Sequence, residues 1–247
     1  MRGVILAGGT GSRLHPLTRI TNKHLLPIGD RPMISYGIEA LVKAGVTEIM
    51  VVTGGTHAGE FLRLLSNGQE FGVERLLYAY QERAGGIAEA LGLAAQFVGD
   101  DPVVVMLADN IFGRSFATSV DRFAAEPKGA RLVLAEVADP AHLSHLGVPE
   151  LDESGQIVRI VEKPKDPPSA YCVTGVYLYD SSVFDVIQTL KPSGRGELEI
   201  TDVNNHYVSE HAIGYDVQQG FWGDAGESIE AYYAVNDYVR RYGANLD

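Results

Sequence analysis

The stretch LAGGTGSRLHPLTRITNKHLLPI, from Leu6 to Ile28, combines glycines, threonines and basic residues in a segment that is otherwise mostly apolar. It begins at the end of an apolar run, Arg2–Ala7, which predicts a buried strand. A glycine-rich turn directly after a buried strand has three interpretations: a dinucleotide site, a nucleoside triphosphate site, or a turn that binds no ligand. The rest of the sequence narrows the choice.

Strand and helix patterns alternate through the first half of the chain. The predicted strands are Arg2–Ala7, Glu48–Thr53, Val73–Tyr80 and Pro102–Ala108, and the predicted helices are Met33–Ala44, His57–Leu65 and Gly86–Val98. This alternation predicts an α/β fold with a doubly wound, largely parallel sheet and helices on both faces. Ligands of such sheets bind at the carboxyl ends of the strands, and both the glycine-rich stretch and Asp109 fall there.

The second half of the chain has the pattern of a mixed sheet. Its predicted strands are Ala130–Val137, Gly147–Leu151, Gln156–Lys163 and Tyr171–Tyr179, and its predicted helices are Ser182–Leu190, Leu198–Ser209 and Glu227–Tyr242. The sequence LDESG, which starts at Leu151, has the composition of a hairpin turn. Because no linker or repeat interrupts the chain, we expect one domain over 1–247, with halves of about 1–110 and 111–225 and a closing helix over 226–243.

Charge is distributed unevenly along the chain. The net charge of −12 argues against a general nucleic-acid binder, because such proteins carry a basic surface. Residues 1–31 reverse this balance, since their only acidic residue is Asp30. The basic residues of this segment are Arg2, Arg13, Arg19, Lys23 and Arg31. A positive pocket in an acidic protein favours a small, highly anionic ligand.

The single cysteine and the hydropathy pattern bear on location. Cys172 has no partner for an internal disulfide, which fits a reducing cytoplasm. The apolar run at the start is too short for a signal peptide, and no later segment is long enough to cross a bilayer. We therefore expect a soluble, cytoplasmic protein with no membrane partner.

Two common phosphate-binding loops do not fit the glycine-rich stretch. The dinucleotide fingerprint G-x-G-x-x-G would need a glycine where this chain has Leu14, and an acidic residue at the end of the second strand, where it reads VTGG. The P-loop needs a lysine directly after its last glycine, and here Gly11 is followed by Ser12. These spacings alone do not exclude the third interpretation, a turn that binds no ligand.

The complete string LAGGTGSRLHPLTRITNKHLLPIGDRPMI resembles the signature of the sugar-nucleotide pyrophosphorylases. Further strings of that family follow in order: LADNIF (Leu107–Phe112), VEKP (Val161–Pro164), YCVTGVYLYD (Tyr171–Asp180) and LKPSGRGELEITDVN (Leu190–Asn204). The last string is most similar to the thymidylyl-transferring branch. The resemblance implies a nucleotide-binding first half, a sugar-binding second half, and transfer from dTTP to glucose 1-phosphate that yields dTDP-glucose and pyrophosphate.

Such a transfer depends on in-line positioning and neutralised charge more than on acid–base chemistry. The resemblance places Arg13 on the leaving pyrophosphate and Lys23 beside the reacting phosphates, and with Asp109 these residues form the expected catalytic set. Bare glycine backbone lets N–H groups approach phosphate closely. The expected nucleotide contacts are Leu6, Gly8, Gly9, Gly11, Ser12, Arg13, Gln81 and Gly86. The expected sugar-phosphate contacts are Gly147, Glu162, Lys163 and Val173.

Mg²⁺ is the cofactor that the resemblance implies, with Asp109 and Asp224 as its ligands. Mg²⁺ prefers one or two carboxylates together with phosphate oxygens and water. Asp109 ends an apolar strand, which is a costly place for a carboxylate that has no cation nearby. Each aspartate could instead cap a following helix, so the sequence leaves both interpretations open.

Three residues depart from the family pattern. The family reads a proline after Gln81 and an aspartate before the second glycine, where this chain has Glu82 and Gly85. Leu146 precedes Gly147, where relatives carry an aromatic or bulky residue. The departures at Glu82 and Gly85 leave the fine shape of the base pocket undetermined.

Several alternatives remain at this stage. UTP could replace dTTP, giving UDP-glucose, because thymine and uracil differ by one methyl group. A non-catalytic nucleotide-sugar sensor is a second alternative, although such a module would be expected to lose its cations or metal ligands first. Whether the chain forms a homo-oligomer is left open. Because only GANLD follows the last predicted helix, we expect the feedback site of longer relatives to be missing.

Two further features suggest chemistry without requiring it. His142 and His145 have a spacing that could bind a metal on a helix, but no neighbouring acid in the sequence completes a site, so we interpret them as surface or capping residues. Cys172 lies in the middle of an apolar strand and is interpreted as a small core residue rather than a nucleophile.

Overall fold

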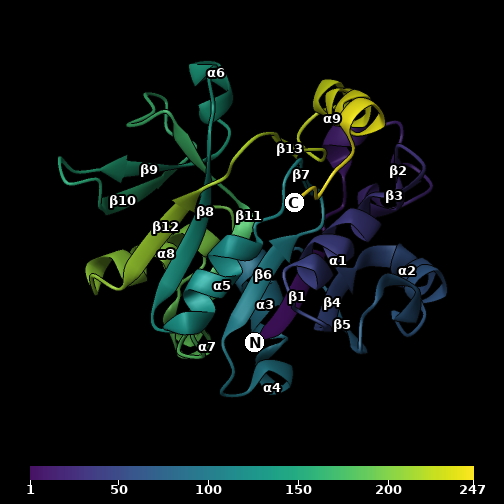
Figure 1. Cartoon of the computed structure of the whole chain (residues 1–247), viewed down its shortest axis with the longest axis horizontal. Helices are drawn as coiled ribbons and strands as arrows, with labels where there is room; N and C mark the ends of the chain where they lie inside the picture. Colours follow the sequence, from purple (N-terminus) through teal and green to yellow (C-terminus); the bar gives the residue numbers. More distant parts are fainter.

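Strand β1 (Arg2–Ala7) lies inside a seven-stranded sheet in the computed structural model, which describes all 247 residues (Figure 1). The strand order is β12 (Ile213–Val217), β8 (Ala130–Glu136), β11 (Tyr171–Tyr179), β6 (Val103–Leu107), β1, β4 (Glu48–Gly54) and β5 (Arg75–Gln81). Only β11 runs antiparallel to its neighbours, β6 and β8. The predicted α/β class with a largely parallel, doubly wound sheet is confirmed, and both halves of the chain contribute strands to this one sheet.

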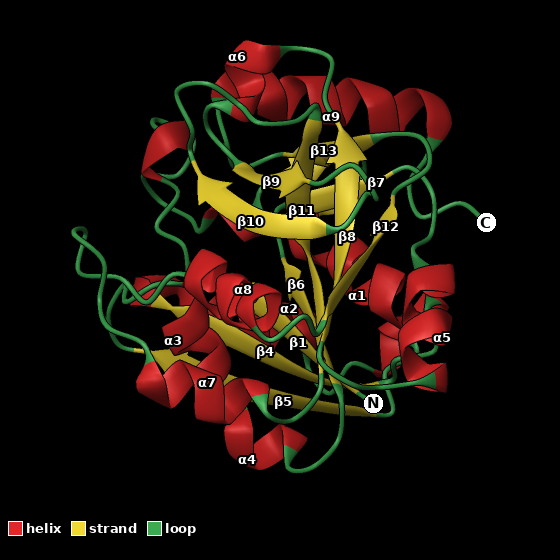
Figure 2. Cartoon of the chain, turned by 90° about the vertical axis from the view of Figure 1, so that its left-hand side faces the viewer, coloured by secondary structure: helices red, strands yellow, loops and turns green.

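Helices cover both faces of the sheet (Figure 2). One face packs against α3 (Ile87–Gly92), α4 (Ala95–Val98), α7 (Val183–Thr189) and α8 (Ile200–Ser209), and the other against α1 (Met33–Lys43), α2 (Ala58–Leu65) and α5 (Ala117–Ala125). Side chains alternate along a strand, so Val4 enters the first core and Ile5 the second. Burial on both faces explains why β1 has no polar side chain after Arg2. No helix combines the length and apolar character needed to cross a bilayer.

Shorter elements build the rim above the carboxyl ends of the strands. A hairpin of β9 (Gly147–Leu151) and β10 (Ile157–Glu162) follows α6 (Pro140–Leu143), and β7 (Asn110–Phe112) pairs with β13 (Trp222–Asp224). The pair β2 (Pro27–Ile28) and β3 (Arg31–Pro32) lies beneath α9 (Ile229–Tyr242), as Figure 1 shows. Buried side chains of α9 share a core with Leu14 and Leu26, so this helix holds the glycine-rich stretch from outside.

Some local predictions were wrong. The single helix expected over Gly86–Val98 is broken into α3 and α4, because the N–H groups of Leu93 and Ala94 donate to carbonyls only three residues back, directly after Gly92. Strand β12 was not predicted, because its side chains are only half-buried and give a weak apolar pattern. Helix α5 was also not predicted; it is short, and its mean hydropathy is low.

Candidate active site

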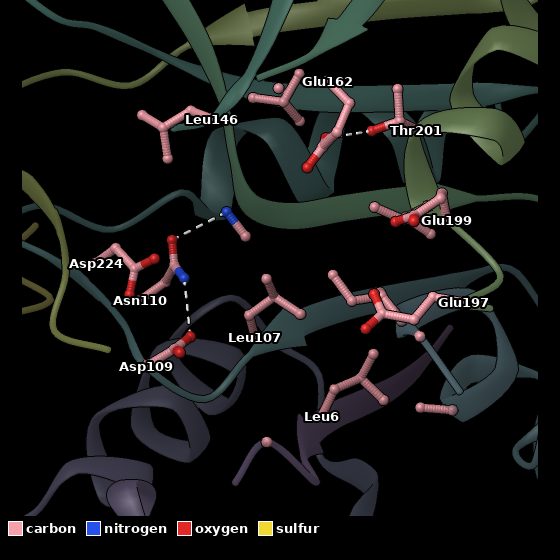
Figure 3. A pocket seen from close by; sticks show the side chains of 18 of the residues that line it. Leu6, Leu107, Asp109, Asn110, Leu146, Glu162, Glu197, Glu199, Thr201 and Asp224 are labelled. Atoms are coloured by element: carbon pink, nitrogen blue, oxygen red, sulfur yellow. Dashed lines mark hydrogen bonds between the residues drawn. The ribbon is translucent and has the colours of Figure 1, made fainter. Parts of the chain in front are cut away.

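A cavity of about 340 Å³ opens at the carboxyl ends of β1, β5 and β6, where Leu6, Gln81 and Leu107 line it. Figure 3 shows Asp109 and Asp224 on one side of this cavity and Glu197 and Glu199 on the opposite side. A position at the carboxyl edge of a parallel sheet is where doubly wound folds bind their ligands.

Nearly all residues expected to contact substrates or metal meet at this cavity. The expected residues that line it are Leu6, Gly8, Gly9, Arg13, Lys23, Gln81, Gly86, Asp109, Gly147, Glu162, Lys163, Val173 and Asp224. Gly11 and Ser12 do not line it. Gly11 instead shapes the loop: it has a φ of 67°, and its carbonyl accepts a 2.7 Å hydrogen bond from the Thr18 hydroxyl.

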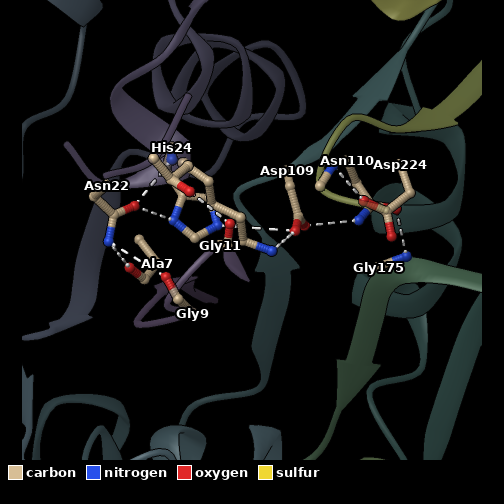
Figure 4. A network of polar contacts seen from close by, with 12 residues as sticks. Ala7, Gly9, Gly11, Asn22, His24, Asp109, Asn110, Gly175 and Asp224 are labelled. Atoms are coloured by element: carbon tan, nitrogen blue, oxygen red, sulfur yellow. Dashed lines mark hydrogen bonds and ion pairs between the residues drawn. The ribbon is translucent and has the colours of Figure 1, made fainter. Parts of the chain in front are cut away.

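Asn22 ties the glycine-rich loop to the end of β1 (Figure 4). Its side-chain amide donates to the carbonyls of Ala7 and Gly9, at 3.5 and 3.4 Å. Its amide oxygen accepts from the backbone N–H of His24 at 2.9 Å and lies 2.8 Å from the His24 ring nitrogen Nδ1. Burial and the charge of Lys23 lower the pKa of His24 to about 3, so this imidazole is neutral. These contacts hold the short helical turn Lys23–Leu25 against the cavity.

Lys23 forms a buried ion pair with Asp109 at the cavity floor. Burial opposes the charged state of both groups, but each group's charge favours ionisation of the other. The pKa of Lys23 is raised, and the pKa of Asp109 is held below its usual range, so the pair is fully ionised at neutral pH.

Pairing of β7 with β13 brings Asp224 beside the end of β6, opposite Asn110 in the strand register. Burial and the nearby charge of Asp109 raise the pKa of Asp224 to about 7. Helix α9 is capped by Ser228, which accepts from the N–H of Ala231 at 3.0 Å, so Asp224 is not its cap. Asp109 leads directly into β7 rather than into a helix. Neither aspartate therefore serves as a helix cap.

Asn110 is a site residue that the sequence analysis missed. It is buried, and its side-chain oxygen accepts from the backbone N–H of Gly175 at 3.0 Å and from the indole of Trp222 at 2.7 Å. Its amide donates to Asp109 at 3.2 Å (Figures 3 and 4). Asn110 thus ties three strands together at the carboxylates. Its position next to Asp109 at a strand end was the available signal.

The hairpin of β9 and β10 supplies, together with β11, the residues expected to hold the sugar phosphate. The register of β10 with β9 places Glu162 directly opposite Gly147. One Glu162 oxygen accepts from the hydroxyl of Thr201 at 2.8 Å, and the other lies 3.3 Å from the Lys163 ammonium. Thr201, on α8, was not among the expected site residues although it lies in the string that carried the resemblance.

Another group from that string, Arg195, Glu197 and Glu199, also lines the cavity. Arg195 donates to Glu199 through two nitrogens, at 3.2 and 2.8 Å. This loop lies in the string that carried the resemblance, although none of its side chains was among the expected site residues. The acidic and basic partners close the side of the cavity that faces away from Asp109.

The fold brings an acid to His142 that the sequence did not indicate. An acid does lie beside it in the fold: Glu227, from the loop before α9, is 2.7 Å from the imidazole nitrogen Nε2. His142 also stacks on Trp222, and His145 lines the cavity. No group of three or more His, Cys, Asp or Glu side chains is arranged to hold a metal ion. Through its stacking on Trp222, His142 contacts β13, the strand that carries Asp224.

Comparison with known proteins defines the class. Residues 2–241 match the nucleotidyl transferase family, and the chain belongs to that family. A glucose-1-phosphate thymidylyltransferase from Actinoplanes sp. is 45% identical over 97% of this chain and 78% of its own length. The enzyme of the same name from Mycolicibacterium smegmatis is 42% identical over 97% of this chain and 82% of its own length.

Solved structures agree with this assignment. A crystal structure from Bacillus anthracis, described as a candidate glucose-1-phosphate thymidylyltransferase in complex with sucrose, has a TM-score of 0.91 and 48% identity. The match covers 97% of this chain and 95% of that one. A UDP-glucose pyrophosphorylase complexed with UDP-glucose has a TM-score of 0.80 at 25% identity, covering 97% and 98% of the two chains.

Proposed function

We propose that this protein transfers a thymidylyl group from dTTP to glucose 1-phosphate, producing dTDP-glucose and pyrophosphate. The observation that carries the proposal is the meeting, at one cavity, of the cations Arg13 and Lys23 with the carboxylates Asp109 and Asp224. The relatives named thymidylyltransferases at 40–45% identity over nearly the full chain support the choice of dTTP and glucose 1-phosphate.

The chemistry follows from the charges that line the cavity. A phosphate oxygen of the sugar phosphate attacks the α-phosphorus of the nucleotide, and the bond to pyrophosphate breaks. Lys23 lies where it can neutralise the reacting phosphates, and Arg13 offers a planar pair of donors to the leaving pyrophosphate. Lys163 supplies positive charge beside Glu162, on the sugar side. The main contribution of the protein is alignment of two anions that would otherwise repel each other.

We further propose that Asp109 and Asp224 bind Mg²⁺. The buried Asp109 and the half-buried Asp224 share this side of the cavity. Desolvation, and after it the negative charge of Asp109, raises the pKa of Asp224, as expected of paired anions with the cation Lys23 beside them. Two carboxylates with room for phosphate oxygens and water suit Mg²⁺. The bound ion would neutralise charge on the nucleotide phosphates.

A metal-dependence experiment tests these ligands. We expect Asp224→Asn to abolish most turnover while the circular dichroism spectrum is unchanged, and excess EDTA to stop the wild-type protein until Mg²⁺ is restored. Asp237→Asn, an exposed substitution on α9, is the matched control and should keep full activity. Near-normal turnover of Asp224→Asn would show that the metal has other ligands.

A substrate panel tests the reaction itself. Each nucleoside triphosphate is combined with each sugar 1-phosphate and Mg²⁺, and pyrophosphate release is followed. We expect dTTP with glucose 1-phosphate to be among the best pairs and UTP to be a tolerated second nucleotide, because one methyl group discriminates by only ~1–3 kcal/mol. Binding of nucleotide sugar without pyrophosphate release in any mixture would favour a sensor instead of an enzyme.

We also propose that the protein works in the cytoplasm. Its one cysteine is free and buried, as is usual in a reducing compartment. Cell fractionation with an antibody against the native protein tests this location.

A further inference from the structure

We propose that Glu89 orients the amide of Gln81 and thereby restricts the site to pyrimidines that carry a hydrogen on ring atom N3. The inference rests on the proposed function, because it assumes that the base lies against Gln81. It assigns a positioning role to Glu89, which lies on α3 and which none of the sequence motifs singled out.

Both hydrogens of the Gln81 amide are taken by acceptors. Its nitrogen Nε2 donates to a Glu89 carboxylate oxygen at 3.2 Å and to the carbonyl of Gly86 at 3.2 Å. Because a carboxylate and a carbonyl can only accept, the amide cannot turn round without placing oxygen against oxygen. The oxygen Oε1 of Gln81 is therefore the atom left for a ligand.

That oxygen lies over the glycine-rich turn. A Cβ atom built on Gly8 would be 2.9 Å from Oε1 of Gln81, so this oxygen lies beside the backbone of residue 8. Gln81 and Gly8 both line the cavity, and Gln81 is otherwise buried. The polar group that Gln81 offers to a base in the cavity is therefore a hydrogen-bond acceptor.

The carboxylate of Glu89 occupies the space that a side chain at position 85 would need. A Cβ atom built on Gly85 would lie 2.1 Å from the carboxyl carbon and from each oxygen of Glu89. The family pattern has an aspartate at this position, and this chain has glycine there. We infer that the acidic group is retained but comes from α3 instead of from the loop.

Arg83 holds this carboxylate in place. Its Nε and Nη2 atoms donate to the second Glu89 oxygen at 3.3 and 3.1 Å, which leaves the first oxygen for Gln81. Arg83 is largely exposed, so this pair adds little stability by itself, but it biases the orientation of Glu89.

A fixed acceptor selects among pyrimidines by the state of ring atom N3. Thymine and uracil carry a hydrogen on N3 and can donate to Gln81, whereas cytosine has a lone pair there and would face the oxygen with no hydrogen between them. Leaving such a polar pair unmatched costs about 10- to 100-fold in selectivity. Glu89 therefore excludes cytosine but does not distinguish thymine from uracil.

The experiment compares kcat/KM for dTTP and dCTP in the wild type, in Glu89→Gln and in Glu89→Ala. Both substitutions remove the charged acceptor and leave the Gly86 carbonyl as the only acceptor that still opposes rotation of the Gln81 amide, so we expect the dTTP-to-dCTP ratio to fall about 10-fold. Glu82→Gln is the matched control, since Glu82 is an exposed acid of the same loop, and it should keep the wild-type ratio. An equal loss for both nucleotides in the Glu89 variants would indicate a merely structural role and overturn the inference.

A rescue experiment tests whether Glu89 replaces the acidic side chain that the family has at position 85. The backbone of Gly85 is not in the left-handed region, so only space limits a side chain there. Gly85→Asp alone should lose activity because its side chain collides with Glu89. The double variant Gly85→Asp/Glu89→Ala should have higher activity, and a stronger preference for dTTP over dCTP, than Glu89→Ala alone. Failure of the combined variant to exceed Glu89→Ala in this preference contradicts the exchange.

Failure of the inference can be separated from failure of the proposed function. Trp222 is the only tryptophan and lies at the cavity, so its fluorescence reports nucleotide binding without turnover. If the wild type neither binds nor consumes dTTP, the proposed function is wrong. If it consumes dTTP and the Glu89 variants keep the wild-type nucleotide ratio, only the role of Glu89 is wrong.

Discussion

The ammonium of Lys23 and the carboxylate of Asp109 form an ion pair across 86 positions of sequence, between the loop after β1 and the end of β6. The side chains of the pair are 15% and 9% exposed. Because β1 and β6 are neighbours in the sheet, their carboxyl ends meet, and the pair connects the phosphate-facing loop to the carboxylates.

Removal of one member of this pair should destabilise the fold. Lys23→Met leaves Asp109 buried beside Asp224 with no counter-charge, and breaking a buried pair costs about 3–5 kcal/mol. The double variant Lys23→Met/Asp109→Leu should recover much of the free energy of unfolding, while both variants lose activity. Urea unfolding followed by circular dichroism measures this.

The control for that experiment is the exposed pair of Arg159 and Glu150, whose side chains are 65% and 39% exposed. Arg159→Met should change the free energy of unfolding by less than about 1 kcal/mol. If Lys23→Met has an equally small effect, the buried pair does not hold the loop.

Gly226 should be essential to activity because of the space around it. A Cβ atom there would lie 2.4 Å from a carboxylate oxygen of Asp109 and 2.7 Å from the ammonium of Lys23. We expect Gly226→Ala to lower kcat at least about 100-fold by displacing these groups, since small misplacements at a reacting centre have effects of that size. Gly59→Ala, with no atom within 4 Å of its Cβ, should keep full activity and gain up to about 1 kcal/mol of helix stability. Full activity of Gly226→Ala would show that the pair can move freely.

Lys163 and Arg13 should separate the two substrates kinetically. Lys163→Ala removes charge on the sugar side, so it should raise KM for glucose 1-phosphate about 10-fold and change KM for dTTP by less than about 2-fold. The exposed Lys165→Ala is its control. Equal effects on both KM values would contradict the sugar-side assignment.

Arg13→Ala should act mainly on kcat. Negative charge on the leaving pyrophosphate grows in the transition state, so loss of this cation should lower kcat by about 100-fold or more. Arg19→Ala, in the same loop and exposed, should leave kcat unchanged. Steady-state rates at saturating dTTP measure the difference, and an Arg13→Ala effect confined to KM would place Arg13 outside the transition-state contacts.

Cys172 should be chemically inert in the folded protein. Burial raises the pKa of its thiol to about 12, so at pH 8 only about 1 in 10⁴ of the side chains is ionised, and none is accessible. Iodoacetamide at pH 8 should leave the native protein unmodified and still active, and should label it once urea unfolds it. Mass spectrometry measures this, and rapid labelling of the native protein would refute it.

Features that depend on residues a few positions apart, such as strand character and burial, could be predicted from the sequence alone. A run such as Gly3–Ala7 has no polar side chain because both faces of β1 are buried, so its strand character and depth can be inferred without any long-range information. The expected positions of Asp109 and Gln81 at strand ends followed in the same way, and the structure places both at the cavity. The roles assigned to these residues stay predictions until the variants are measured.

Which strand ends meet at the cavity, and which contacts hold them together, could be seen only in the folded structure. Asp224 lies near Asp109 because β13 pairs with β7. Glu227, in the loop between β13 and α9, contacts His142, which is 85 positions away in the sequence. The contact of Glu89 with Gln81 spans only eight positions, yet it depends on the turn between β5 and α3, where Gly86 has a φ of 101°. Periodicity reports how deeply a side chain is buried, not which distant side chain it faces, because the facing partner is set by strand order and by the turns between elements.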